Sequence, residues 1–137
     1  MGLRGGASTP ETLRHVEDVS EYWEILKKII YPGAKGPTEY SQNFSIRGLN
    51  DATSYALIFL DAAYRSGSEK RINTTLKLFT QSLLPITKEY AKKYSDSIEG
   101  LAKNLKQYLR PHLSEPTAQN LIKVYYDNLG LKYEDEN

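Results

Sequence analysis

Residues 50–64 constrain the fold of this chain more than any other segment. From Tyr55 to Tyr64 the sequence is apolar or aromatic except at Asp61, so a helix here has almost no polar face. A helix that is apolar on all sides is normally buried at the centre of a bundle or lies in an interface between subunits. Asn50 or Asp51 can cap its start and Gly67 ends it. We therefore expect a central helix that other helices surround.

Apolar side chains at spacings of three and four predict helices in the rest of the chain, and no segment has a convincing strand pattern. A first helix is predicted over residues 9–31, followed by a Pro/Gly loop over residues 32–49. That loop is long for a tight helical hairpin, so we expect the first helix to extend partly away from the bundle. The predicted fold class is all-α, a small antiparallel helical bundle of four to five helices.

The bundle itself is predicted over residues 50–131. Pro85 removes a backbone donor, so the third helix must kink or end there. Residues 85–109 then form either one helix or two, because Asp96 can cap a second start. The last helix opens at Pro116 and ends at Gly130, where a left-handed cap is expected with an apolar contact from Leu131.

The two ends of the chain have distinctive compositions. Residues 1–8 contain three glycines, and ordering such a segment loses a large backbone entropy. We expect a flexible N-terminal arm that becomes ordered when a partner holds it. Residues 132–137 form a short, mostly acidic tail.

Composition and motifs give no indication of an enzyme, a metal or another cofactor. The chain has no cysteine, which excludes disulfides, thiolate metal ligands and thiol nucleophiles. Glu11, His15 and Asp18 would share one helix face as a metal or acid–base site, but an exposed polar face explains them more simply. His112 is expected in a surface turn. No apolar run approaches the roughly 20 residues that a membrane span needs.

The charge is segregated although its formal net value is only +1. Residues 65–110 hold ten basic side chains against four acidic ones, and the remainder of the chain is acidic overall. If residues 85–109 form one helix, five cations share about 60° of its circumference: Lys88, Lys92, Lys103, Lys106 and Arg110. Such a ridge suits phosphate backbones, although a solvated helix face remains the alternative.

Tyrosine occurs eleven times, and its position along the helices separates two groups. The first lies on predicted core stripes: Tyr90, Tyr94, Tyr108 and Tyr125. The second lies off the stripes or in loops: Tyr31, Tyr40, Tyr126 and Tyr133. Because tyrosine combines a large ring with a hydroxyl, the second group is predicted to contact other molecules.

The layout of arm, separated first helix and compact bundle resembles the coat proteins of filamentous viruses that infect hyperthermophilic archaea. The resemblance is one of architecture and composition rather than of a shared motif. It implies a structural protein that assembles in many copies, with itself or a related paralogue, around double-stranded DNA in a helical filament. The implied backbone contacts are Arg4, Arg14, Lys27, Lys28, Lys88, Lys92, Lys103, Lys106 and Arg110.

Two other classes remain open from the sequence. A small helical subunit that lines nucleic acid in a ribonucleoprotein complex of the CRISPR type would have a similar composition. A helical protein–protein adaptor would use the tyrosine-rich surface and no phosphate contacts. The resemblance implies location in a virion, and the alternatives imply the cytoplasm.

Overall fold

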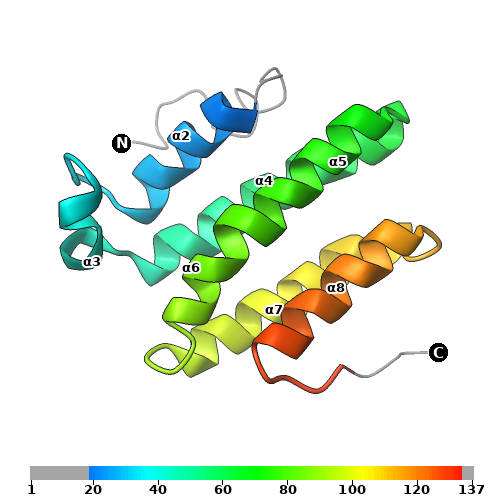
Figure 1. Ribbon diagram of the computed structural model, residues 1–137. Coiled ribbons are helices and arrows are strands. Elements are labelled where there is room, and N and C mark those ends of the chain that lie inside the picture. Colours follow the sequence, from blue (N-terminus) through cyan, green and yellow to red (C-terminus); the bar gives the residue numbers. More distant parts are fainter. Residues whose placement is uncertain (1–18, 134–137) are drawn as a thin grey trace.

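The structure is a computed structural model, and it describes residues 19–133 (Figure 1). The predicted arm 1–8, the first half of the helix predicted over 9–31 and residues 134–137 lie outside the described residues. Within the described range the chain is helical and has no strand, which confirms the all-α class. Six helices longer than one turn occur there, one more than the upper limit of the prediction: α2 (Val19–Ile30), α4 (Ile46–Ser66), α5 (Glu69–Leu78), α6 (Leu84–Glu89), α7 (Ser95–Leu109) and α8 (Pro116–Asn128).

The long helix α4 lies at the centre of the fold, as its apolar sequence predicted. It packs against α2, α5 and α7, and its buried residues include Leu49, Leu57 and Leu60, which are fully enclosed. Each surrounding helix buries one side against it, so a single core holds the described helices together. The apolar faces of α4 are therefore covered within one chain.

Two helical hairpins form the bundle (Figure 1). The first contains α4 and the α5–α6 arm, and the second contains α7 and α8. The helices are antiparallel within each hairpin, but α4 and α7 run in the same direction. Two contacts show this direction: Asn104 hydrogen-bonds to Ser54, and His112, later in the sequence, hydrogen-bonds to Asp61, which is also later. In the sequence, the α5–α6 arm connects α4 to α7 and runs in the opposite direction to both (Figure 1).

Helix α2, the described part of the predicted first helix, packs on α4 and α5, so for residues 19–30 the prediction of a partly detached helix is wrong. Tyr22, Leu26 and Ile30 of α2 are fully buried. The Tyr22 hydroxyl donates a 2.9 Å hydrogen bond to the carbonyl oxygen of Tyr55 on α4. The two helices approach so closely near Gly48 that a Cβ atom there would overlap the carbonyl oxygen of Ile29. The glycine thus permits the docking that the loop length argued against.

The segment predicted as loop 32–49 is shorter and more ordered than expected. It contains a 3-10 turn, Pro37–Glu39, and a single helical turn, α3 (Tyr40–Asn43). Helix α4 begins at Ile46 rather than near Asn50, because the Ser45 hydroxyl accepts a 2.9 Å hydrogen bond from the Gly48 amide and caps the helix earlier. Asn50 lies inside the helix.

The chain passes Pro85 without ending the helical arm. A π-helical turn, Phe79–Leu83, joins α5 to α6, and the Leu84 amide bonds to the carbonyl of Phe79, five residues earlier. This wider turn lies directly before Pro85, where a regular helix would bring the ring against the carbonyl four residues back. The buried Tyr125 hydroxyl of α8 also donates to the Phe79 carbonyl, at 3.4 Å.

Residues 85–109 form two helices. Helix α6 ends at Glu89, a turn follows, and α7 begins at Ser95 with Tyr94 as its N-cap residue. The five cations would form a continuous ridge only if residues 85–109 were one helix, and the break removes that condition: Lys88 is on α6, Lys92 is in the turn, and the other three are on α7 or just beyond it.

The tyrosines predicted to contact other molecules make aromatic contacts within the chain. Tyr31 is buried and stacks on Tyr40, with ring centroids 4.1 Å apart. Tyr126 is buried and meets Tyr133 edge to face at 5.4 Å. Tyr108, predicted on a core stripe, is 38% exposed instead. Helical spacing placed Tyr108 on the edge of its stripe, where a small error in angle moves a side chain into solvent.

Over residues 19–133, none of the helices is long and apolar enough to cross a membrane.

Candidate nucleic-acid interface

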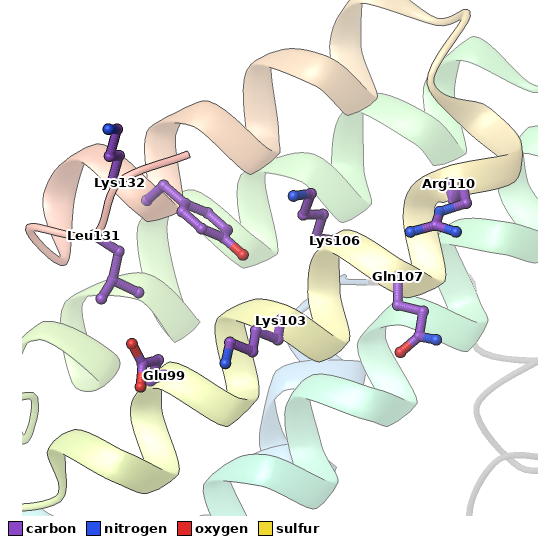
Figure 2. Close-up of a pocket in the computed structure, with 8 residues that line it drawn as sticks. Glu99, Lys103, Lys106, Gln107, Arg110, Leu131 and Lys132 are labelled. Carbon is purple, nitrogen blue, oxygen red and sulfur yellow. The ribbon is translucent and has the colours of Figure 1, made fainter. Parts of the chain in front are cut away.

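The C-terminal half of α7 and the residue that follows it place three cations along one side of the helix. Lys103, Lys106 and Arg110 are separated by three and four residues, which is the spacing of side chains on one helix face. Figure 2 shows them in succession along α7, with Gln107 beside them. The opposite side of α7 carries Leu101 and Leu105, which are buried in the core. Burial of the apolar stripe therefore directs the cations outward.

A fourth cation, Lys132, lines the same groove from the segment that follows α8, at the end where Glu99 lies (Figure 2). Gly130 adopts a left-handed conformation with φ of 69°. Its amide bonds to the Asp127 carbonyl at 3.2 Å, and the Leu131 amide bonds to the Tyr126 carbonyl at 2.8 Å. These two bonds define a Schellman cap, and they confirm the predicted end of the helix. After the cap, Leu131 points toward the Glu99 side of the groove, and the Lys132 side chain lies at the rim and points away from α7 (Figure 2).

Helix α7, the end of α8 and the segment after α8 line a groove of about 510 Å³ that is open to solvent (Figure 2). We call this the basic groove and define it by its lining residues: Glu99, Lys103, Lys106, Gln107, Arg110, Tyr126, Leu131 and Lys132. Four of the eight residues are cationic and one is acidic. The groove therefore has a positive local charge although the whole chain is nearly neutral.

Aromatic rings support the groove from beneath. Tyr126 is buried on α8, and the Tyr133 ring packs edge to face against it. The Lys106 ammonium nitrogen lies 5.0 Å from the centroid of the Tyr133 ring, within the range of a cation–π contact. These contacts hold the C-terminal segment against α7 and limit the rotamers that Lys106 can adopt. The basic groove is thus partly preorganised.

Most of the charged side chains in the groove are exposed. Glu99, Lys103, Arg110 and Lys132 are largely in solvent, and Lys106 is half-buried. A single exposed charge on a protein binds a small counterion only weakly. A group of cations binds a polyanion because binding releases the cations that are condensed along the phosphates. Glu99, one turn before Lys103 on α7, places the one carboxylate at the end of the groove away from Arg110 (Figure 2). The strongest positive charge therefore lies toward the α7–α8 turn.

Two other predicted contacts lie elsewhere on the bundle. The Lys88 ammonium on α6 donates to Asn128 on α8 at 3.3 Å, in a separate shallow depression that Pro85 and Glu89 also line. Lys92 is exposed in the α6–α7 turn. The break between α6 and α7 separates both side chains from the basic groove.

Of the predicted contacts at the N-terminal end, the two that the structure describes, Lys27 and Lys28, do not line the groove. Arg4 and Arg14 lie outside the described residues. Lys27 of α2 forms a 2.7 Å ion pair with Glu24, and hydrogen bonding to that carboxylate raises the pKa of Lys27. Lys28 is exposed on α2, which packs on α4 and α5 rather than on α7.

A second polar cluster joins α4 to the turn after α7. The two carboxylate oxygens of Asp61 contact His112 and Arg65, each at 2.6 Å. The Tyr64 ring stacks on the His112 imidazole at 4.8 Å, and its hydroxyl hydrogen-bonds to Thr117 of α8. His112 was predicted to be a surface side chain in a turn. It does lie in a turn, but it is half-buried and paired with Asp61. Asp61 is occupied on both oxygens, and this cluster ties the α7–α8 turn, a 3-10 segment at Arg110–His112, to α4.

Sequence reasoning missed Lys132 and Tyr126 as members of the site. Lys132 was assigned to an acidic tail, and Tyr126 to a contact with another molecule. The available signal was Gly130: a left-handed cap reverses the chain, so the residues after it must lie against an earlier helix.

Comparison with known protein families, with characterised proteins and with solved structures found no match.

Proposed function

We propose that this protein binds the phosphate backbone of nucleic acid through the basic groove, as a non-enzymatic structural protein. The observation that carries the proposal is the row Lys103, Lys106 and Arg110 on one face of α7, completed by Lys132 from the segment after α8. Four cations with one carboxylate beside them match a polyanion better than a small neutral ligand. Contacts of this kind read no base sequence.

The spacing of the row suits a duplex. Lys103 and Arg110 are seven residues apart, which is about 10 Å along a helix. A DNA duplex carries one charge per ~1.7 Å of its axis, so about six phosphates lie within that length. One copy therefore neutralises only a short stretch of backbone, and a strong interaction with nucleic acid needs several copies side by side.

The need for several copies agrees with the coat proteins that the layout resembles. In this proposal many copies, or copies of this chain and a paralogue, coat double-stranded DNA in a helical filament such as a virion. The shape of the first helix differs from that resemblance, because α2 is docked on the bundle. The proposal therefore rests on the groove rather than on an extended helix.

Two alternatives use the same surface differently. A ribonucleoprotein subunit would place single-stranded RNA in the groove, and a protein adaptor would place an acidic partner protein there. Competition between duplex DNA and single-stranded RNA of equal length distinguishes the first alternative. Salt dependence distinguishes the second, because only polyelectrolytes release a large number of condensed counterions.

The test is the affinity for a labelled duplex of about 30 base pairs, measured by fluorescence anisotropy at several salt concentrations. With four phosphate contacts, the slope of log K against log salt is about −3.6, so affinity falls about 150-fold between about 50 and about 200 mM salt. The variant Lys103→Gln with Lys132→Gln should reduce that slope by about 1.8.

The matched control is Lys70→Gln with Lys77→Gln, which removes two exposed cations from α5 and leaves the groove intact. It should keep the slope of the unsubstituted protein. Equal slopes for the two double variants would refute the groove as the binding site. Binding that is insensitive to salt would refute nucleic acid as the ligand.

A further inference from the structure

One narrow face of α4 remains partly exposed although α2, α5 and α7 pack against the helix. The residues on this face follow one another at spacings of three and four, which keeps them on one side of the helix: Asp51, Ser54, Ile58, Ala62 and Arg65. Arg65 is exposed and the other four are half-buried. Ile58, at the centre, does not belong to the core that the described helices share. We call these five residues the α4 face.

Helix α7 brings an exposed aromatic ring to the centre of the α4 face. The hydrogen bonds at Asn104 and His112 fix the register of the two parallel helices, because their partners on α4 lie 50 and 51 positions earlier in the sequence. Tyr108 lies midway between Asn104 and His112, so it lies beside the turn of α4 that contains Ile58. The Tyr108 side chain is exposed. An isoleucine and a tyrosine thus lie side by side on this surface.

The side chains of the α4 face are arranged symmetrically about Ile58. Asp51 lies seven residues before Ile58 and Arg65 seven residues after it, each about 10 Å away along the helix. Ser54 and Ala62 lie four residues before and after Ile58, so small side chains are found on both sides of it. A second α4 that crosses Ile58 in the antiparallel direction therefore places its Arg65 opposite Asp51, and its Asp51 opposite Arg65.

Both charges are available for such a contact. Within residues 19–133, Asp51 forms no ion pair. The Arg65 guanidinium contacts Asp61 at 2.6 Å, but the Arg65 side chain is 77% exposed. A guanidinium has five N–H donors, so it can bind a second carboxylate without releasing the first. The surface therefore offers one carboxylate and one guanidinium at equal distances from its centre.

A twofold axis perpendicular to α4 also brings the two tyrosines together. This axis reverses the direction of α4 and leaves α7 of one copy opposite α7 of the other. Because Tyr108 lies beside Ile58, its ring meets the Tyr108 ring of the second copy near the axis. Contacts with this symmetry are the commonest between identical chains. The basic groove stays open, because Tyr108 and Lys106 are two residues apart and lie about 160° apart around α7.

We propose that the α4 face and Tyr108 form a twofold contact between copies of this chain on nucleic acid. This inference rests on the proposed function and names the surface through which its copies meet. Each copy contributes one isoleucine and one tyrosine, which is too little apolar surface for a stable dimer, since such a dimer buries about 1,200 Å² or more. The contact therefore forms when a shared duplex raises the local concentration of the copies to about 1 mM.

The sequence contains no cysteine, so a single introduced thiol reports on this contact. Ile58→Cys places one thiol of each copy at the proposed axis, where the Cα atoms come within the ~7 Å that a disulfide needs. The matched control is Ala62→Cys on the same face, whose two thiols lie about 12 Å apart along α4. Each variant is oxidised with and without a long duplex that holds several copies. Non-reducing gel electrophoresis measures the fraction of covalent dimer.

We expect most of the Ile58→Cys protein to form covalent dimers on the duplex and about a tenth to do so without it, because the duplex concentrates the copies. Ala62→Cys should give about fivefold fewer dimers on the duplex, because its thiols lie beyond disulfide reach.

Charge substitutions in the Ile58→Cys background test the symmetry. Adding Asp51→Arg should lower the dimer fraction about threefold, because two arginines then face each other in each half of the contact. Adding Arg65→Glu as well exchanges the two charges, and it should restore the dimer fraction. Recovery through a second substitution shows that the single change removed the contact and left the fold intact.

The outcomes separate the two proposals. Binding of the duplex with equal dimer fractions for Ile58→Cys and Ala62→Cys overturns the twofold contact and leaves the basic groove intact. A dimer fraction that does not recover after the charge exchange also overturns the twofold contact. Failure of the unsubstituted protein to bind the duplex overturns the proposed function and this inference with it.

Discussion

Replacing Gly48 by alanine tests whether α2 is docked on α4. On helix propensity alone, Gly48→Ala inside α4 should stabilise the protein by about 1 kcal/mol. The structure predicts the opposite sign. A Cβ atom would overlap the carbonyl oxygen of Ile29 and lie 3.0 Å from its carbonyl carbon and 3.2 Å from the Cα of Ile30. All three are backbone atoms, so no side-chain rotation relieves the overlap.

The size of the effect follows from what must move. Helix α2 has to retreat from α4, which strains the 2.9 Å hydrogen bond from the Ser45 amide to the Ile30 carbonyl and loosens the buried contacts of Leu26 and Ile30. Overpacking against a rigid neighbour costs about 3 kcal/mol at the upper end of the usual range. After the gain in helix propensity, we expect the free energy of unfolding to fall by about 2 kcal/mol.

Gly100→Ala provides the matched control. Gly100 lies on the exposed side of α7 with no atom within 4 Å of the added Cβ, so only propensity acts there. It should raise the free energy of unfolding by about 0.5 to 1 kcal/mol. Urea denaturation followed by circular dichroism measures both variants. If Gly48→Ala were as stable as Gly100→Ala, the close approach of α2 and α4 would not exist in solution.

Two further predictions concern buried tyrosines and the Asp61 cluster. Burial raises the pKa of Tyr125 and of Tyr22 well above the ordinary value, and raises that of Tyr31 to about 12. Above pH ~10 the unfolded chain therefore loses phenolic protons that the folded chain keeps, so the contribution of these tyrosines to stability is constant below that pH and falls as pH rises toward 12. Tyrosine absorbance and urea midpoints measured from pH 7 to 12 would contradict this if every tyrosine titrated near pH 10 in the folded protein. Asp61→Ala should lower the free energy of unfolding by about 1 to 3 kcal/mol, because it leaves half-buried His112 without its partner. Arg65→Ala, which removes only the exposed partner of Asp61, should lower the free energy of unfolding by less than about 1 kcal/mol. Equal effects of the two substitutions would show that the Asp61–His112 contact does not stabilise the packing of the α7–α8 turn on α4.

Much of the fold was predictable because helical periodicity and capping are local. The all-α class, the central position of α4 and the cap at Gly130 each follow from residues that lie close together in the sequence. The end of α2 near residue 31 was predictable in the same way, from Pro32 and Gly33. These features need no knowledge of which helices meet.

The errors arose where tertiary contacts decide. The docking of α2 depends on a close approach at Gly48, and a helical glycine gives no sign in the sequence of what lies opposite it. The passage through Pro85 depends on a π-helical turn whose carbonyl is hydrogen-bonded by Tyr125, 46 residues away. Local patterns in the sequence do not reveal partners that are so far apart along the chain.

The candidate site was predictable only in part. Lys103, Lys106 and Arg110 share a face on any helix that contains them, so their grouping was correct whether or not α6 and α7 were joined. Lys88 and Lys92 needed the joined helix and were separated by its break. Lys132 lines the groove because the backbone changes direction at Gly130. The spacing of residue types along the sequence does not indicate which earlier helix the chain meets after that change.

The enclosure of α4 has a consequence for how copies of this chain can meet. The apolar faces of α4 are covered by α2, α5 and α7. Among residues 21–133, whose burial the structure describes, Tyr108 is the single large apolar side chain with more than a third of its surface in water. The described surface therefore offers little apolar area that contact between copies could bury. Under the proposed function, we expect free copies to remain separate and nucleic acid to be required for them to assemble.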